Sequence, residues 1–171
     1  MHILATGLVL VGLALPHHAG ATDYLIEAGT TKAWEDAVFV DVSRIVRRGN
    51  YRDVWITYVW NGAEIRDDIK VSLALDRVSC SEHTYVELSA TGYLSSGEPA
   101  GSWDLGSTAP TVKYIVPETT MDAIANLACL NRPLKNPESK GFRPLPQGIK
   151  PEEFADRMYA EATSGNSKLT K

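Results

Sequence analysis

The stretch AVFVDVSRIVRRGNYRDVWITYVW, residues 37–60, decides the fold class, because it predicts two β-strands joined by a turn. Valine recurs at every second position over residues 38–42, which is the period of a strand. Residues 54–60 are dense in the β-branched and aromatic side chains that strands favour. Between them, residues 48–52 (RGNYR) supply turn chemistry, since Gly and Asn adopt positive φ readily. We therefore expect an antiparallel hairpin with a five-residue connection.

Three further segments predict that this hairpin belongs to a larger sheet. Residues 69–79 and 83–94 alternate apolar and polar side chains, and residues 112–116 form a last short strand. Such alternation is typical of an antiparallel sheet with one solvated face. Residues 92–108 are rich in Gly, Ser and Pro, so we expect a long loop that contains Trp103.

A helix is expected after the last strand. Pro117 fits the first turn of a helix, where its missing N–H is no loss. Apolar side chains at helical spacing, from Met121 to Ala128, carry this helix to Cys129.

The first 21 residues predict a cleavable signal peptide. Residues 3–16 are apolar and uncharged, and small side chains at Ala19 and Ala21 fit the pattern that signal peptidase accepts. The apolar core is too short for a typical membrane-spanning helix. We therefore expect export, with no transmembrane anchor after cleavage. An uncleaved anchor or a buried hydrophobic helix is the alternative.

The two cysteines, Cys80 and Cys129, both follow the expected cleavage point. In an oxidising compartment an even count predicts a disulfide, and two cysteines allow only one intramolecular pairing. Such a bridge stabilises a domain by about 4 kcal/mol in the chain-entropy model. Two reduced core thiols are the competing interpretation, which export disfavours.

Charge divides the mature chain into two parts. Residues 22–130 hold 9 basic and 16 acidic side chains, whereas residues 131–171 hold 8 basic and 5 acidic ones. We expect one acidic domain over 22–130, and its charge argues against a nucleic-acid partner. Five prolines within residues 131–151 predict a mostly disordered tail over 131–171, in which residues 151–162 could form a short helix.

No motif in the sequence predicts catalysis. His83 is the one histidine outside the expected signal peptide, and it is expected at the surface beside Glu82. A metal site needs several His or Cys ligands, and both cysteines are expected to pair. We find no Gly-x-Ser-x-Gly elbow and no phosphate-binding glycine loop. We therefore expect a non-enzymatic protein without metal or cofactor.

Four arginines around the first hairpin are the candidate binding residues: Arg44, Arg47, Arg48 and Arg52. A basic patch on an acidic domain could dock an acidic partner or a sulfated polymer. The alternative is a charged hairpin tip that protects the strand edge from aggregation. Trp55 and Trp60 cannot share one face of a regular strand, so one of them is either exposed for binding or covered by the long loop.

Five short motifs between residues 34 and 130 carry a resemblance to a known family. They are VDVSRI at 40–45, RGNYRDVW at 48–55, GSW at 101–103, VPET at 116–119 and LAC at 127–129. In this order they resemble the surface-adhesin protein E-like family of Gram-negative envelope proteins. The resemblance implies an antiparallel sheet packed on a C-terminal helix, with Cys80 and Cys129 bridged. The fold class that we expect is accordingly α+β, with one sheet of about five to six strands.

The resemblance also sets the functional hypotheses. The best-known member of the family is an adhesin that binds host matrix proteins, which implies a protein partner, an extracellular-matrix protein being one candidate. That adhesin is a lipoprotein, and this sequence shows no lipobox cysteine. The alternative is therefore a soluble periplasmic accessory or stress-related protein whose tail docks onto another envelope component. An enzyme of unrecognised type would gain support only if His83 were buried against acids.

Overall fold

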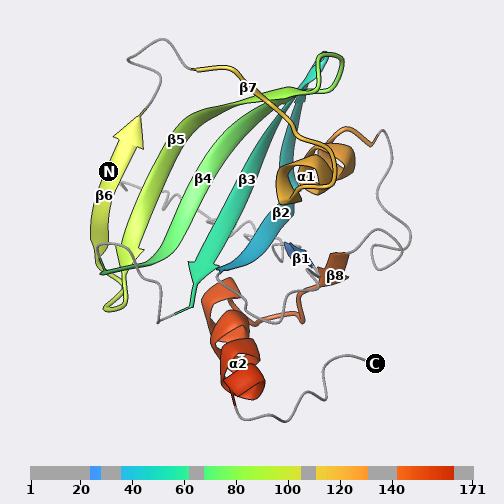
Figure 1. Ribbon diagram of the computed structural model, residues 1–171. Coiled ribbons are helices and arrows are strands. Elements are labelled where there is room, and N and C mark those ends of the chain that lie inside the picture. Colours follow the sequence, from blue (N-terminus) through green and yellow to red (C-terminus); the bar gives the residue numbers. More distant parts are fainter. Residues whose placement is uncertain (1–23, 28–35, 62–67, 105–110, 131–141, 164–171) are drawn as a thin grey trace, which may run out of the picture.

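The computed structural model describes residues 24–27, 36–61, 68–104, 111–130 and 142–163 (Figure 1). The expected signal peptide, residues 1–21, lies outside these ranges and stays a prediction.

One antiparallel sheet forms the body of the molecule (Figure 1). Its five long strands are β2 (Asp36–Arg48), β3 (Tyr51–Trp60), β4 (Ile69–Ser79), β5 (Thr84–Leu94) and β6 (Pro99–Asp104). Three short strands, β1 (Tyr24–Glu27), β7 (Lys113–Tyr114) and β8 (Phe142–Pro144), extend its edges. The order is β6-β5-β4-β3-β2-β1-β8, and β7 pairs with β5 beyond the end of β6. The expected α+β class with a single antiparallel sheet is confirmed.

Two connections differ from the prediction. The β2–β3 hairpin turns at Gly49 and Asn50 alone, not over five residues, because Gly49 adopts a φ of +59° and the strands stay paired up to this turn. The expected long loop over residues 92–108 is also wrong in its first part, where β5 turns and returns as β6. Gly97 at φ +85° makes that turn, and Gly92 pairs with Gly101 in the ladder. Small side chains here therefore belong to a strand.

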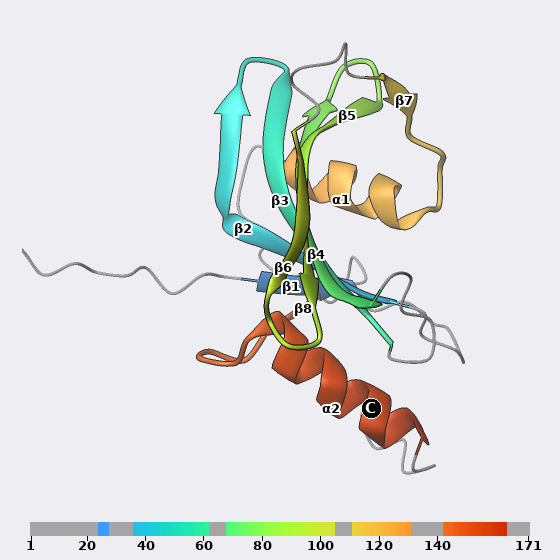
Figure 2. The same ribbon diagram turned by 90° about the vertical axis from the view of Figure 1, so that its left-hand side faces the viewer.

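Alternate side chains of β2 point to opposite faces of the sheet. Val38 and Val40 contact helix α1 (Thr120–Ala128) through a shared core, whereas Ala37 and Phe39 contact helix α2 (Pro151–Thr163). We call these the α1 face and the α2 face. Figure 2 shows the sheet edge-on, with α1 against one side and α2 at the opposite end. This alternation follows from the two-residue period of a strand.

Helix α1 is tied to the sheet at its C-terminal end. The Cys80–Cys129 disulfide joins the turn after β4 to the residue that caps α1, with a Cα–Cα distance of 5.7 Å. This pairing confirms the expectation from the sequence. The helix begins later than expected, at Thr120, because the Thr119 side chain accepts a hydrogen bond from the backbone N–H of Asp122. Pro117 accordingly lies outside the helix and not in its first turn.

Much of the segment expected to be mostly disordered belongs to the fold. Phe142 in β8 is buried in the core that α1 shares with the sheet. The short helix considered for 151–162 is α2, which packs Ala155 and Tyr159 against Phe39. The Tyr159 hydroxyl donates a hydrogen bond of 2.6 Å to the Val59 carbonyl. Residues 142–163 therefore extend the fold past residue 130, while 131–141 and 164–171 lie outside the described residues.

Replacing Tyr159 by Phe tests the docking of α2. The substitution removes the buried donor to Val59, so we expect a loss of about 1–2 kcal/mol in the free energy of unfolding. The measurement is urea denaturation followed by circular dichroism. Arg157→Gln is the control, because its ion pair with Glu153 is solvent-exposed and contributes little. Identical midpoints for Tyr159→Phe and the parent would contradict this packing.

Candidate interaction surface at the disulfide end of the sheet

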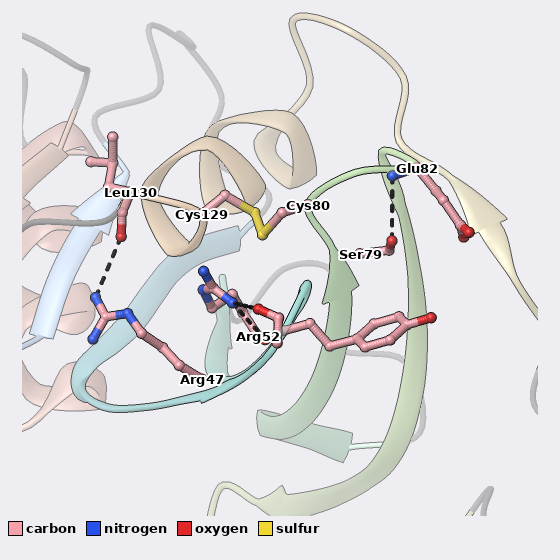
Figure 3. The surroundings of a disulfide bond; sticks show 9 residues. Arg47, Arg52, Ser79, Cys80, Glu82, Cys129 and Leu130 are labelled. Atoms are coloured by element: carbon pink, nitrogen blue, oxygen red, sulfur yellow. Dashed lines mark hydrogen bonds between the residues drawn. A yellow bond between two sulfur atoms is a disulfide. The ribbon is translucent and has the colours of Figure 1, made fainter.

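Three chain segments meet where the disulfide lies (Figure 3). The Cys80 backbone N–H donates to the Asn50 carbonyl at 2.9 Å, which joins the β4–β5 turn to the β2–β3 turn. Arg47 Nη2 donates to the Leu130 carbonyl at 3.4 Å, which joins the hairpin to the segment after α1. Together with the disulfide, these contacts link the three segments at this end of the sheet.

The four predicted arginines all lie at this end, but on two faces of the sheet. Arg52 is on the α1 face and only 7 % exposed. Its Nη1 donates to the carbonyls of Gly49 at 2.7 Å and Tyr51 at 2.8 Å, so this side chain shapes the turn (Figure 3). Arg47 is paired with Arg52 across the hairpin and is exposed.

Arg44 and Arg48 bind carboxylates that belong to the α2 face. Arg44 forms an ion pair with Asp41, and its guanidinium lies 5.6 Å from the centre of the Trp55 ring. Arg48 Nε donates to Asp53 Oδ2 at 2.8 Å. The patch inferred from the sequence is therefore not one uniform cationic surface, since its members have different partners.

The sequence reasoning missed Arg77, a fifth arginine at this site. It lies on β4 directly opposite Asp53, with Arg77 Nε 2.7 Å from Asp53 Oδ1 and Nη2 3.0 Å from Oδ2. These hydrogen bonds, with a further one from Arg48, outweigh burial and hold the pKa of Asp53 below its ordinary value. A correct register for β3 and β4 would have found Arg77, because it faces the same side as Asp53.

Apolar side chains are exposed at the same end of the molecule. The exposed large hydrophobic residues in the described part of the chain are Val46, Tyr51, Val112, Tyr114, Val116 and Leu130. The pairing register places Tyr51, Ser79, Thr84 and Tyr114 in one row across four strands. Three of the exposed residues, Val46, Tyr51 and Tyr114, therefore lie on the α2 face at this end of the sheet. Exposed hydrophobic patches mark interaction sites.

We define the tip surface as five side chains that the register places on the α2 face, far from α2 itself: Val46, Arg48, Tyr51, Arg77 and Tyr114. Arginine and tyrosine are enriched at protein interfaces, where they supply much of the binding energy. The Asp53 side chain beneath them is 8 % exposed, against 61 % for Arg48 and 37 % for Arg77. The tip surface consequently presents positive charge between apolar groups.

The structure places His83 beside the first turn of α1. His83 is exposed in the turn between β4 and β5, and its Nε2 lies 3.1 Å from Asp122 Oδ1. It is therefore at the surface, as expected, and not buried in a pocket. Within the described residues no three His, Cys, Asp or Glu side chains converge as metal ligands would.

A cleft of about 650 Å³ lies at the other end of the α2 face, between β4, the β5–β6 turn and α2. Lys70 and Asp156 form a 2.6 Å ion pair on its wall, and Tyr93 also lines it. Acidic, basic and apolar groups are mixed there, so its lining favours no particular class of ligand.

Asp76 is a buried acid on the α1 face. Its side chain lies opposite Glu87, and its Oδ1 accepts no hydrogen bond within the described part of the chain. Burial raises the pKa of Asp76 to about 7, with a further increase from the Glu87 charge, while Lys113 acts in the opposite direction. Asp76 therefore affects stability near neutral pH and is not part of the tip surface.

A family model described as surface-adhesin protein E matches residues 28–130. The chain belongs to this family. Searches of curated proteins and of solved structures find no match to it. The match ends just after Cys129, so in this surface-adhesin E protein β8 and α2 lie beyond the matched region.

Membership of the family implies a surface or envelope protein. No helix in the described ranges is both long and apolar enough to cross a membrane.

Replacing Asp76 by Asn tests the burial of this acid. Because the folded-state pKa is about 7 and the unfolded value is 3.8, the folded protein binds the proton more tightly between these values. Stability should therefore fall as pH rises from about 4 to 7. Asp76→Asn should remove this pH dependence. At pH 8 its free energy of unfolding should exceed that of the parent by about 2–4 kcal/mol.

The measurement is urea denaturation of parent and variant between pH 4 and pH 8. Glu98→Gln, at an exposed acid, is the control and should keep the pH dependence of the parent. A variant as pH-dependent as the parent between pH 5 and 7 would show that Asp76 is not the group responsible.

Proposed function

We propose that this protein is an exported, non-enzymatic module of the Gram-negative envelope that binds a protein partner through the tip surface. The observation that carries the proposal is the gathering of exposed apolar side chains with Arg48 and Arg77 at one end of the sheet. The family supports the proposal, since the matching family model is described as surface-adhesin protein E. Host extracellular-matrix proteins are the first partners to test.

A covalent bond and a backbone hydrogen bond support the hairpin end as a binding surface. The disulfide and the Cys80 to Asn50 hydrogen bond fix the two turns beneath it. A surface that is already ordered loses less conformational entropy when it binds. Tyr114 is 81 % exposed and can therefore contribute binding area without contributing much to the folded core.

Binding should depend on the tyrosines of the tip surface. The purified mature chain, residues 22–171, is tested by surface plasmon resonance against immobilised extracellular-matrix proteins. Tyr51→Ser and Tyr114→Ser should each weaken binding about tenfold, as loss of an interface tyrosine does. Tyr93→Ser, at the cleft near α2, is the matched control and should bind like the parent.

Thermal melting of each variant separates loss of binding from loss of folding. A double variant of Tyr51 and Tyr114 that is folded and binds fully would exclude the tip surface. Failure of the parent to bind any matrix protein would remove the host-adhesin part of the proposal.

We further propose that the domain is displayed on the cell surface, for which the family is the support. Protease shaving of intact cells should release tryptic peptides from residues 44–113 without lysis, identified by mass spectrometry. A periplasmic marker protein that remains protected is the control. Protection of these peptides until the outer membrane is permeabilised would instead favour the periplasmic accessory protein.

A further inference from the structure

Two guanidinium groups of the tip surface meet on one buried carboxylate. Arg48 from β2 and Arg77 from β4 both donate to Asp53 Oδ2 on β3, at 2.8 and 3.0 Å. The ladder orients the three side chains, because Asp53 is directly opposite Arg77 and follows Tyr51, the partner of Arg48, by two residues. Three strands thus bring the two cations together at a fixed position.

Asp53 uses only part of the hydrogen-bonding capacity of these arginines. A guanidinium carries five N–H donors in a plane. Asp53 engages Nε of Arg48, and Nε and Nη2 of Arg77. Both terminal nitrogens of Arg48, and Nη1 of Arg77, have no hydrogen bond to any other described residue. One carboxylate opposite two guanidiniums also leaves a net charge of +1.

We propose that Arg48 and Arg77 form a clamp, oriented by Asp53, that binds an acidic side chain of the protein partner. This inference rests on the proposed function and adds the chemistry of the ligand. Hydrogen bonds between arginine and carboxylate are strong and directional, and a second arginine adds both charge and donors. Asp53 is a positioning residue, because it holds the two arginines without contacting the ligand.

The surroundings of the clamp favour a protein segment over a sulfated polysaccharide. Val46 lies opposite Asp53, and Tyr51 lies opposite Arg48, so apolar groups adjoin the cations. A polyanion binds best along a continuous series of exposed cations. Here Arg52 is buried and Arg44 is paired with Asp41, which interrupts such a series. The ligand that fits is a segment with acidic and aromatic or aliphatic side chains.

The test uses a defined peptide pair and nuclear magnetic resonance. The probe is the blocked peptide Glu-Tyr-Leu-Glu, and its neutral match is Gln-Tyr-Leu-Gln. The acidic peptide should shift the Nε–H signals of Arg48 and Arg77 saturably, whereas the neutral peptide should bind at least tenfold more weakly. Arg48→Gln and Arg77→Gln should each weaken the acidic peptide about tenfold, and Arg157→Gln should not.

Arg77→Lys separates a clamp from simple charge, because lysine keeps the charge and loses the forked donors. The clamp predicts that this variant also binds about tenfold more weakly. Full binding by Arg77→Lys, or equal shifts with both peptides, would overturn the proposal. Tighter binding of a heparin decasaccharide at the same signals would also overturn it in favour of a polysaccharide.

The clamp and the proposed function can fail separately. If matrix-protein binding requires Tyr51 and Tyr114 but is unchanged in Arg48→Gln and Arg77→Gln, the clamp is wrong and the function stands. If the acidic peptide binds at the clamp but the parent binds no protein, the clamp stands and the function is wrong.

Discussion

The antiparallel register of β2, β3 and β4 is the constraint on which the rest of the structure depends. Once Asp53 is paired with Val46 on one side and Arg77 on the other, every second side chain of these strands is assigned to a face. One face then carries the apolar residues that α1 covers, and the other carries the charged and aromatic residues of the tip surface. A shift by one residue would exchange the two sets, so the register specifies both the core and the binding surface.

The two helices cover the sheet unequally, and this determines where a partner can bind. The core under α1 includes Val54 and Val78, while α2 covers the far end of the opposite face near Phe39 and Val59. The α2 face is therefore open at the disulfide end, where Tyr51 and Arg77 lie. The exposed surface therefore lies beside two turns that are joined by a backbone hydrogen bond, one of which also carries the disulfide.

The pKa values of two buried acids, Asp53 on the α2 face and Asp76 on the α1 face, shift in opposite directions. Asp53 has two arginine partners, which offset the cost of burial and lower its pKa. Asp76 has a glutamate as its cross-strand neighbour, so burial is not offset and its pKa rises to about 7. Burial makes the largest contribution at Asp76, whereas the hydrogen bonds from Arg77 make the largest contribution at Asp53. Depth of burial and the neighbours that the register supplies therefore act together to set the direction of each shift.

Local patterns in the sequence determined strands β2 to β5 and the helix before Cys129, because these elements follow from the spacing of apolar residues. The disulfide followed from the count of two cysteines. The sequence also located the hairpin arginines. Tertiary structure alone decided that Arg52 supports the turn, that Arg77 joins Asp53 from 24 residues away, and that α2 packs on the sheet. These features depend on strand register and on which apolar surfaces are left to cover, and both arise only when distant segments pack together.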